Sequence, residues 1–94
     1  MDIRETFKKY EDDFLKFEEI AAPVSKRSDL CAFLILERLL PGEEDIIGAS
    51  EHDEFFLSID VEELSAVATE AEIRDLIRCG IRYDSQYDCL VMFA

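Results

Sequence analysis

The chain has little of what most sites of known chemistry need. Its 94 residues include no tryptophan, one histidine, two prolines and three glycines. With so few glycines there is no Gly-rich loop to hold a phosphate, and no nucleophile-elbow, zinc-protease or phosphate-loop motif occurs. The longest apolar run, Leu30–Leu36, falls well short of the roughly 18 residues of a membrane span. We therefore expect a protein with no enzymatic activity, no cofactor and no membrane-spanning segment.

Cysteine is also scarce. Cys31, Cys79 and Cys89 form no CxxC or other metal-ligand spacing, and an odd number does not fit a secreted disulfide framework. Residues 1–10 are charged throughout and lack the apolar centre of a signal peptide. We expect buried or half-buried free thiols in a cytoplasmic protein. A bridge between Cys79 and Cys89 across a C-terminal hairpin is the geometric alternative.

Positive charge is scarce as well, and its distribution is uneven. Only 10 lysines and arginines stand against 23 aspartates and glutamates, which gives a net charge of -13. No lysine or arginine occurs between Arg38 and Arg74, although this interval is rich in carboxylates. Such a segment repels nucleic acid and membrane surfaces and attracts basic proteins, an attraction that salt weakens. The sequence therefore predicts an acidic partner-binding face. Its predicted members are Glu43, Glu44, Asp45, Glu51, Asp53, Glu54, Glu62 and Glu63.

Apolar periodicity predicts two helices in the first half of the chain. A 4-3-4-3 spacing indicates an amphipathic helix over residues 2–20. Its apolar seam consists of Ile3, Phe7, Tyr10, Phe14 and Phe17. The seam either packs against the rest of the domain or docks on a second copy in a homodimer. Residues 28–40 form the next helix, and because the run after Ser28 is apolar on every side, we expect this helix to be buried and central.

Capping signals predict two further helices within residues 61–79. Asp60 and Thr69 are each followed three residues later by a glutamate, which is the capping-box pattern of a helix start. Gly80 provides a stop for the second of these helices. Two short helices are therefore expected in succession.

Alternating apolar residues predict hairpins over residues 45–60 and 81–93. No linker divides the chain, so residues 1–94 are expected to form a single domain. The predicted class is α+β, with four helices and two β-hairpins in the order α-α-ββ-α-α-ββ. The strands are antiparallel and form either one sheet or two small ones.

The part of the chain from residue 60 to residue 93 has the element order of a winged helix-turn-helix, whose second helix reads the DNA major groove. That helix would begin with Glu70, and it has only Arg74 and Arg78 as bases. Phosphate contacts need a positive face. We therefore expect a winged-helix-like shape without direct nucleic-acid binding.

His52, the only histidine, lies among carboxylates at the tip of the first predicted hairpin. With Asp53 and Glu54 it is a candidate for a metal or acid-base site. Neighbours on an extended strand point to opposite faces, so these groups converge only if the turn curls around an ion. We expect a solvated tip and no metal site.

Residues 48–54 (GASEHDE), 78–84 (RCGIRYD) and 89–94 (CLVMFA) carry a resemblance. They resemble small acidic proteins of uncharacterised function that are encoded in phage and prophage genomes. The resemblance covers roughly the C-terminal half and implies no catalytic or binding residue. It implies a context, because small phage-encoded proteins often act by binding a host protein and some acidic ones imitate DNA.

These observations favour a small, non-enzymatic interaction module that binds a basic protein surface, for example that of a nucleic-acid-binding host protein. One alternative is a soluble dimeric structural or accessory protein whose carboxylates only maintain solubility. A winged-helix DNA-binding protein and a metal-dependent enzyme that uses His52 are two further alternatives. The charge disfavours the first of these and the strand geometry the second. Neither nucleic acid nor a membrane is expected as a direct partner.

Overall fold

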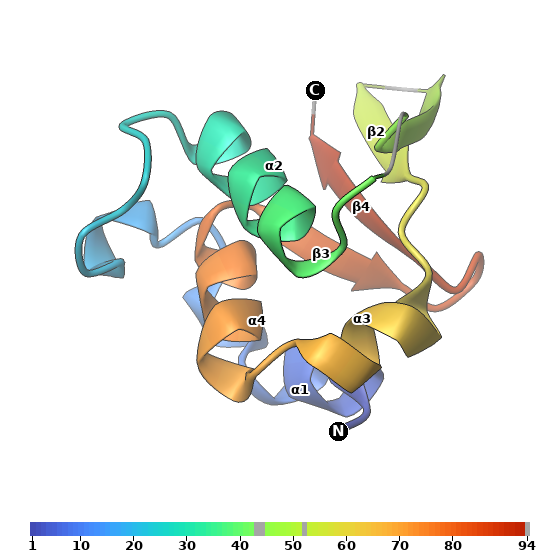
Figure 1. Cartoon of the computed structure of the whole chain (residues 1–94), viewed down its shortest axis with the longest axis horizontal. Coiled ribbons are helices and arrows are strands. Elements are labelled where there is room, and N and C mark those ends of the chain that lie inside the picture. Colours follow the sequence, from blue (N-terminus) through green and yellow to red (C-terminus); the bar gives the residue numbers. More distant parts are fainter. Residues whose placement is uncertain (43–44, 52, 94) are drawn as a thin grey trace.

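A four-stranded antiparallel sheet packs with one face against a layer of helices (Figure 1). The computed structural model describes residues 1–42, 45–51 and 53–93. The strands are β1 Ile47–Glu51, β2 Glu54–Leu57, β3 Ile81–Asp84 and β4 Cys89–Phe93. The helices are α1 Ile3–Lys9, α2 Ser28–Leu39, α3 Val61–Val67 and α4 Glu70–Arg78, with 3-10 turns η1 Glu11–Asp13 and η2 Phe17–Glu19. The predicted α+β class is confirmed, and so is the predicted order of helices and hairpins.

The two hairpins join into a single sheet through their second strands. β2 pairs antiparallel with β4, with Phe55 opposite Met92 and Phe56 opposite Val91. The sheet order is β1-β2-β4-β3, so β1 and β3 are the two edges. This arrangement decides between the one-sheet and two-sheet possibilities that the sequence left open.

Side chains alternate between the two faces of the sheet. Leu57, Ile81, Leu90 and Met92 belong to the buried core that the sheet shares with the helices. Among the helices of the described residues, none combines the length and the apolar character that crossing a bilayer requires.

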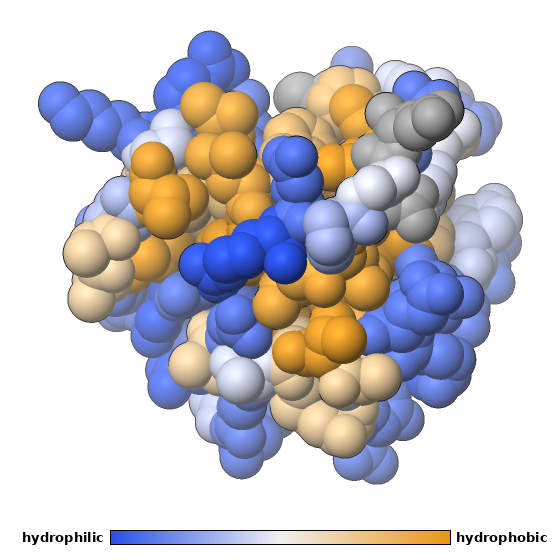
Figure 2. Space-filling view, in the orientation of Figure 1, coloured by the Kyte–Doolittle hydropathy of each residue, from blue (hydrophilic) through white to orange (hydrophobic). Residues whose placement is uncertain are grey.

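Helix α4 takes the central position that the sequence analysis gave to residues 28–40. It packs against α1, α2, β3 and both 3-10 turns, and its Ile73, Leu76 and Ile77 are almost completely buried. α2 buries only one face. Its Leu30 and Leu34 are 46% and 39% exposed, and Figure 2 shows apolar surface over this part of the helix. The expectation of a helix buried on all sides was therefore wrong, because α2 is covered by the domain on one side only.

The N-terminal helix also differs from its prediction. α1 starts as expected, but it ends at Lys9 instead of continuing to residue 20. The following segment folds over the end of α4, where Leu15 adopts a positive φ of 61° and its N–H donates to the Ile77 carbonyl at 3.2 Å. A positive φ at a leucine is incompatible with a continuous helix. Contacts with α4 thus replace the second half of the predicted helix.

The apolar seam of this segment packs within the domain. Ile3 and Phe7 are buried in the core, and Tyr10, Phe14 and Phe17 pack against it. Packing against the domain was one of the two arrangements that the spacing allowed. A homodimer through these side chains stays an untested prediction.

Candidate functional site

Every arginine of the chain forms an ion pair with a carboxylate of the same chain. Arg4, at the start of α1, reaches both Glu62 on α3 at 2.8 Å and Asp88 in the β3–β4 loop at 2.9 Å. The other pairs are Arg27 with Asp29, Arg38 with Glu72, Arg74 and Arg78 with Asp13, Arg78 with Asp75, and Arg82 with Glu54. The planar guanidinium is the side chain best suited to bind phosphate. In this fold, carboxylates of the same chain already pair with these guanidinium groups.

These pairs neutralise part of the predicted acidic face. Glu54 lies 2.7 Å from Arg82, and Glu62 pairs with Arg4. Glu70, in the same interval, accepts hydrogen bonds from the Tyr10 hydroxyl and from Lys9, and these lower its pKa. The interval has no base close by in the sequence, but the fold brings bases to it from α1 and β3.

The remaining described members of the predicted face lie on the β1–β2 hairpin and on α3. Asp45 and Asp53 are exposed and lie at opposite ends of the β1–β2 hairpin, and Glu63 is exposed on α3. Within the described residues, these three side chains form no ion pair. Glu51 is exposed on β1, whereas Glu43 and Glu44 lie outside the described residues.

The structure describes two of the three candidate metal ligands, Asp53 and Glu54. His52 lies outside the described residues, Asp53 is exposed at the hairpin turn, and Glu54 is held by Arg82. The described part of the chain contains no group of three or more His, Cys, Asp or Glu side chains that could hold a metal ion.

The helix that would read DNA in a winged-helix protein is covered by the N-terminal segment. Asp13 of η1 lies 2.9 Å from Arg74 and 3.6 Å from Arg78. Arg74 also stacks over the Tyr10 ring, with 4.4 Å between its guanidinium carbon and the ring centroid. The two bases of α4 therefore hold η1 in place. The order of two helices and a hairpin is present, but α4 does not present a free basic face.

Arg4 also binds the carboxylate of Asp88, which lies in the loop that follows β3. It donates to both carboxylate oxygens of Asp88, and the Tyr83 hydroxyl donates to the same carboxylate. These hydrogen bonds, first from Arg4 and then from Tyr83, lower the pKa of Asp88. The N-terminal helix is thereby tied to the C-terminal hairpin.

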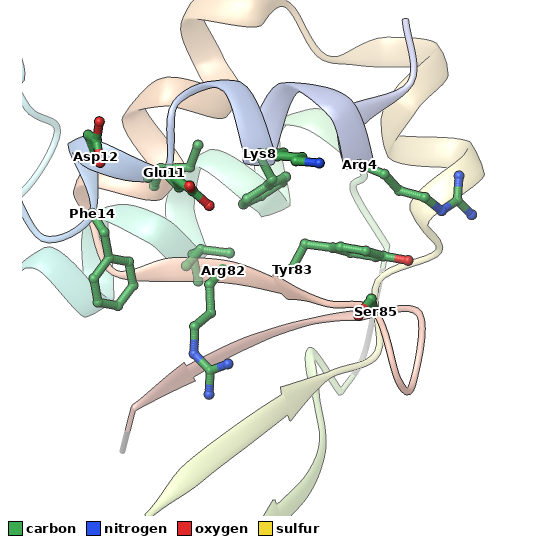
Figure 3. A pocket seen from close by; sticks show the side chains of 11 residues that line it. Arg4, Lys8, Glu11, Asp12, Phe14, Arg82, Tyr83 and Ser85 are labelled. Carbon is green, nitrogen blue, oxygen red and sulfur yellow. The ribbon is translucent and has the colours of Figure 1, made fainter.

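A groove lies next to this contact, between α1 with η1 on one side and β3 on the other (Figure 3). Its volume is about 720 Å³. The half-buried rings of Phe14 and Tyr83 contribute apolar surface, and Lys8 and Glu11 contribute charge. This groove could not be predicted from the sequence, because its walls come from opposite ends of the chain. The only signals were the apolar seam near the N-terminus and the alternation of Ile81 with Tyr83.

The groove offers a concave, partly apolar surface, and the ion pairs determine which charges remain available to a partner. The chain matches no family model, no curated protein and no solved structure in the comparisons made.

Proposed function

We propose that the protein is a small acidic interaction module of the cytoplasm that binds a basic surface of another protein and catalyses no reaction. The observation that carries this proposal is the occupation of every arginine by the chain's own carboxylates. Exposed carboxylates such as Asp45, Asp53 and Glu63 then dominate what a partner meets. Such a surface attracts basic proteins and repels phosphate backbones.

A nucleic-acid-binding protein of a host is the partner class that we propose first. Proteins of this class present basic surfaces, and the resemblance to acidic phage-encoded proteins points to the same context. Mimicry of a duplex would need carboxylates in a regular row, comparable to phosphates. Glu54 and Glu62 are ion-paired, and Asp45 lies far along the hairpin from Asp53. We therefore propose attraction between opposite charges and not imitation of the DNA shape.

The test is capture of proteins from a nuclease-treated cell lysate by three forms of the protein. The first is the natural chain, and the second carries Asp45→Lys, Asp53→Lys and Glu63→Lys. The third carries Glu5→Lys, Glu18→Lys and Glu37→Lys, which change the net charge by the same amount at other exposed positions.

The natural chain is expected to retain proteins of basic isoelectric point, and salt is expected to release them. The second form should lose them and the third should keep them. Retention of neutral or acidic proteins, or retention that salt does not affect, would contradict the proposal. Equal losses in both variants would assign the effect to total charge and remove the interval 39–73 as the binding surface.

A further inference from the structure

Helix α2 has more apolar surface than the rest of the domain covers. The run from Leu30 to Leu36 is apolar on every side, and a helix of this kind is normally buried all round. In the fold only one side of α2 faces the core, and its buried residues are Cys31, Ala32, Ile35 and Leu36. Leu30 and Leu34, one helical turn apart, remain exposed on the other side, where Figure 2 shows apolar surface. This side of α2 is therefore a surface that a partner can reach and cover.

Opposite charges flank these two leucines. Arg27 precedes Leu30 by three residues, and Glu37 follows Leu34 by three residues. Because residues three and four positions apart share one face of a helix, Arg27, Leu30, Leu34 and Glu37 form a single outer row. All four side chains are exposed, and so is Lys26, which adds a second positive charge beside Arg27. The outer row is thus basic at the start of α2, apolar in the middle and acidic near the end.

These charges stand at the unfavourable ends of the helix. The start of a helix carries a partial positive charge and its end a partial negative charge. Lys26 and Arg27 lie at the start of α2, whereas Glu37 lies in its last turn. Lys26 and Glu37 form no ion pair within the described residues, and Arg27 binds Asp29 through Nε and Nη2, so that Nη1 can bind a second carboxylate. A partner that supplies opposite charges at the two ends would therefore stabilise the helix.

A second copy of the chain has the surface that matches this row. When two α2 helices cross antiparallel about a two-fold axis, an axis between Leu30 and Leu34 brings Leu30 of each copy to Leu34 of the other. The same axis brings Arg27 of each copy to Glu37 of the other, because both residue pairs are centred on position 32. Such self-complementarity is what a two-fold contact requires. A carboxylate of the second copy then lies near the start of α2, where the helix dipole favours negative charge.

The charge balance of α2 also permits two copies to approach each other. Segment 23–40 contains three bases, Lys26, Arg27 and Arg38, and two acids, Asp29 and Glu37, so its net charge is +1 in a chain of net charge -13. The charged side chains of α3, by contrast, are all carboxylates. The domain measures 29 × 26 × 26 Å, and charges are screened over roughly 8 Å at physiological salt, so carboxylates on distant faces contribute little. Repulsion between two copies is therefore smaller through α2 than through α3.

We infer that two copies of the chain associate through the outer rows of their α2 helices, which cross antiparallel about a two-fold axis. Leu30 and Leu34 form the apolar centre of the contact, and two equivalent ion pairs between Arg27 and Glu37 flank it. Because two leucines from each copy make a small interface, the association is weak, with a dissociation constant of about 0.1–1 mM. At the lower concentrations of a capture experiment the chain is a monomer. This inference does not depend on the partner proposed above.

The first test follows the full-length, ¹⁵N-labelled protein as its concentration is raised. Sedimentation equilibrium measures the fraction of dimer, and amide chemical shifts locate the contact. We expect the average mass to rise from that of a monomer towards that of a dimer, with shifts centred on residues 26–38. Leu34→Ser, at an exposed position, should weaken the association several-fold without loss of folding, which thermal unfolding checks.

Charge reversal tests the antiparallel arrangement. Arg27→Glu and Glu37→Arg should each weaken self-association several-fold, because each places like charges at both ends of the contact. The double variant keeps the net charge of the natural chain and should restore the association. An equal mixture of the two single variants should form a mixed dimer, because both contacts again join opposite charges. Glu5→Arg, at an exposed position on α1, has the same charge change as Glu37→Arg and should leave the association nearly unchanged.

Four results would overturn the inference. A monomer at every concentration would leave the outer row of α2 to a different protein. Shifts centred on α1 would assign the association to the N-terminal seam. A double variant or a mixture that does not associate would contradict the antiparallel pairing, and equal effects of Glu5→Arg and Glu37→Arg would assign the change to total charge. Restored association in both the double variant and the mixture is the result that the two-fold contact predicts.

Discussion

Replacing Gly80 with alanine tests the contact that holds the N-terminal segment on α4. Gly80 follows the end of α4 and has a φ of 101°, a conformation that an L-amino acid rarely adopts. A Cβ atom built there would lie 2.8 Å from Cδ2 of Leu15. The same leucine donates its N–H to the Ile77 carbonyl. An alanine at position 80 would therefore be strained in its own backbone and would displace the segment that covers the helix end.

The magnitude follows from opposing contributions. A strained backbone conformation costs about 1–3 kcal/mol. A reduced entropy of the unfolded chain offsets about 0.4–1 kcal/mol of this cost. Leu15 is 55% exposed, so moving its side chain sacrifices little burial. We expect the free energy of unfolding to fall by about 1–2 kcal/mol, and each kcal/mol lowers Tm by about 4–8 °C in a domain of this size.

Urea denaturation of matched variants separates the backbone strain at position 80 from the displacement of Leu15. Gly42 has a similar φ of 97°, but a Cβ there would meet nothing within 4 Å, so Gly42→Ala measures backbone strain alone. Gly80→Ala should destabilise more than Gly42→Ala, and the difference should shrink when Leu15→Ala is added. If Gly80→Ala destabilised no more than Gly42→Ala, the described contact of Leu15 with Gly80 would be refuted.

Three further predictions concern local contacts. Thr69→Ala removes the side-chain half of a capping box and should lower the free energy of unfolding by about 1 kcal/mol, and an unchanged urea midpoint would count against this. Burial raises the pKa of Cys79, so its alkylation in the native state should be slower than that of the less buried Cys89, and mass spectrometry showing equal rates would disprove it. The pKa of Asp88 is lowered by Arg4, so its contribution to stability is present above the unfolded-state pKa and is lost as the pH falls through the lower folded-state pKa. Asp88→Asn should therefore destabilise at neutral pH and lose this effect progressively as the pH falls from the ordinary carboxylate pKa through the lower folded-state pKa, and a pH-independent difference would contradict it.

Local signals predicted the second half of the fold well. Asp60 and Thr69 are the observed N-caps of α3 and α4, and both accept hydrogen bonds from backbone N–H groups of the first helical turn. Gly80 has the positive φ expected after a helix end. These features depend on residues a few positions apart, so periodicity and capping patterns are sufficient to find them.

Tertiary contacts account for the two features that were predicted wrongly from the sequence, the length of the N-terminal helix and the identity of the central helix. The periodicity of residues 2–20 is genuine, but Leu15 breaks the helix because its N–H pairs with Ile77, far along the chain. For the same reason, the central position of α4 could not be read from composition. α2 has the more apolar sequence of the two helices, yet α4 packs against more of the other helices and strands.

The ion pairs within the predicted acidic face were not foreseen for a similar reason. Charge counted along the sequence leaves the interval 39–73 without a base, whereas the fold pairs Glu54 with Arg82 and Glu62 with Arg4. The groove was missed because α1 and β3 meet only in the folded chain. Residue types and their spacing can indicate the sign of a surface, but not which of its charges remain free.

The most direct test of the proposal that the protein meets its partner through carboxylates is a salt series with two ligands. Binding of duplex DNA and of a captured basic protein is measured on the same preparation from about 0.01 M to about 0.15 M salt, where the screening length falls from roughly 30 Å to roughly 8 Å. We expect no DNA binding at any salt concentration and an affinity for the basic protein that falls as salt rises. DNA binding at low salt, or an affinity for the protein that salt does not change, would contradict the proposal.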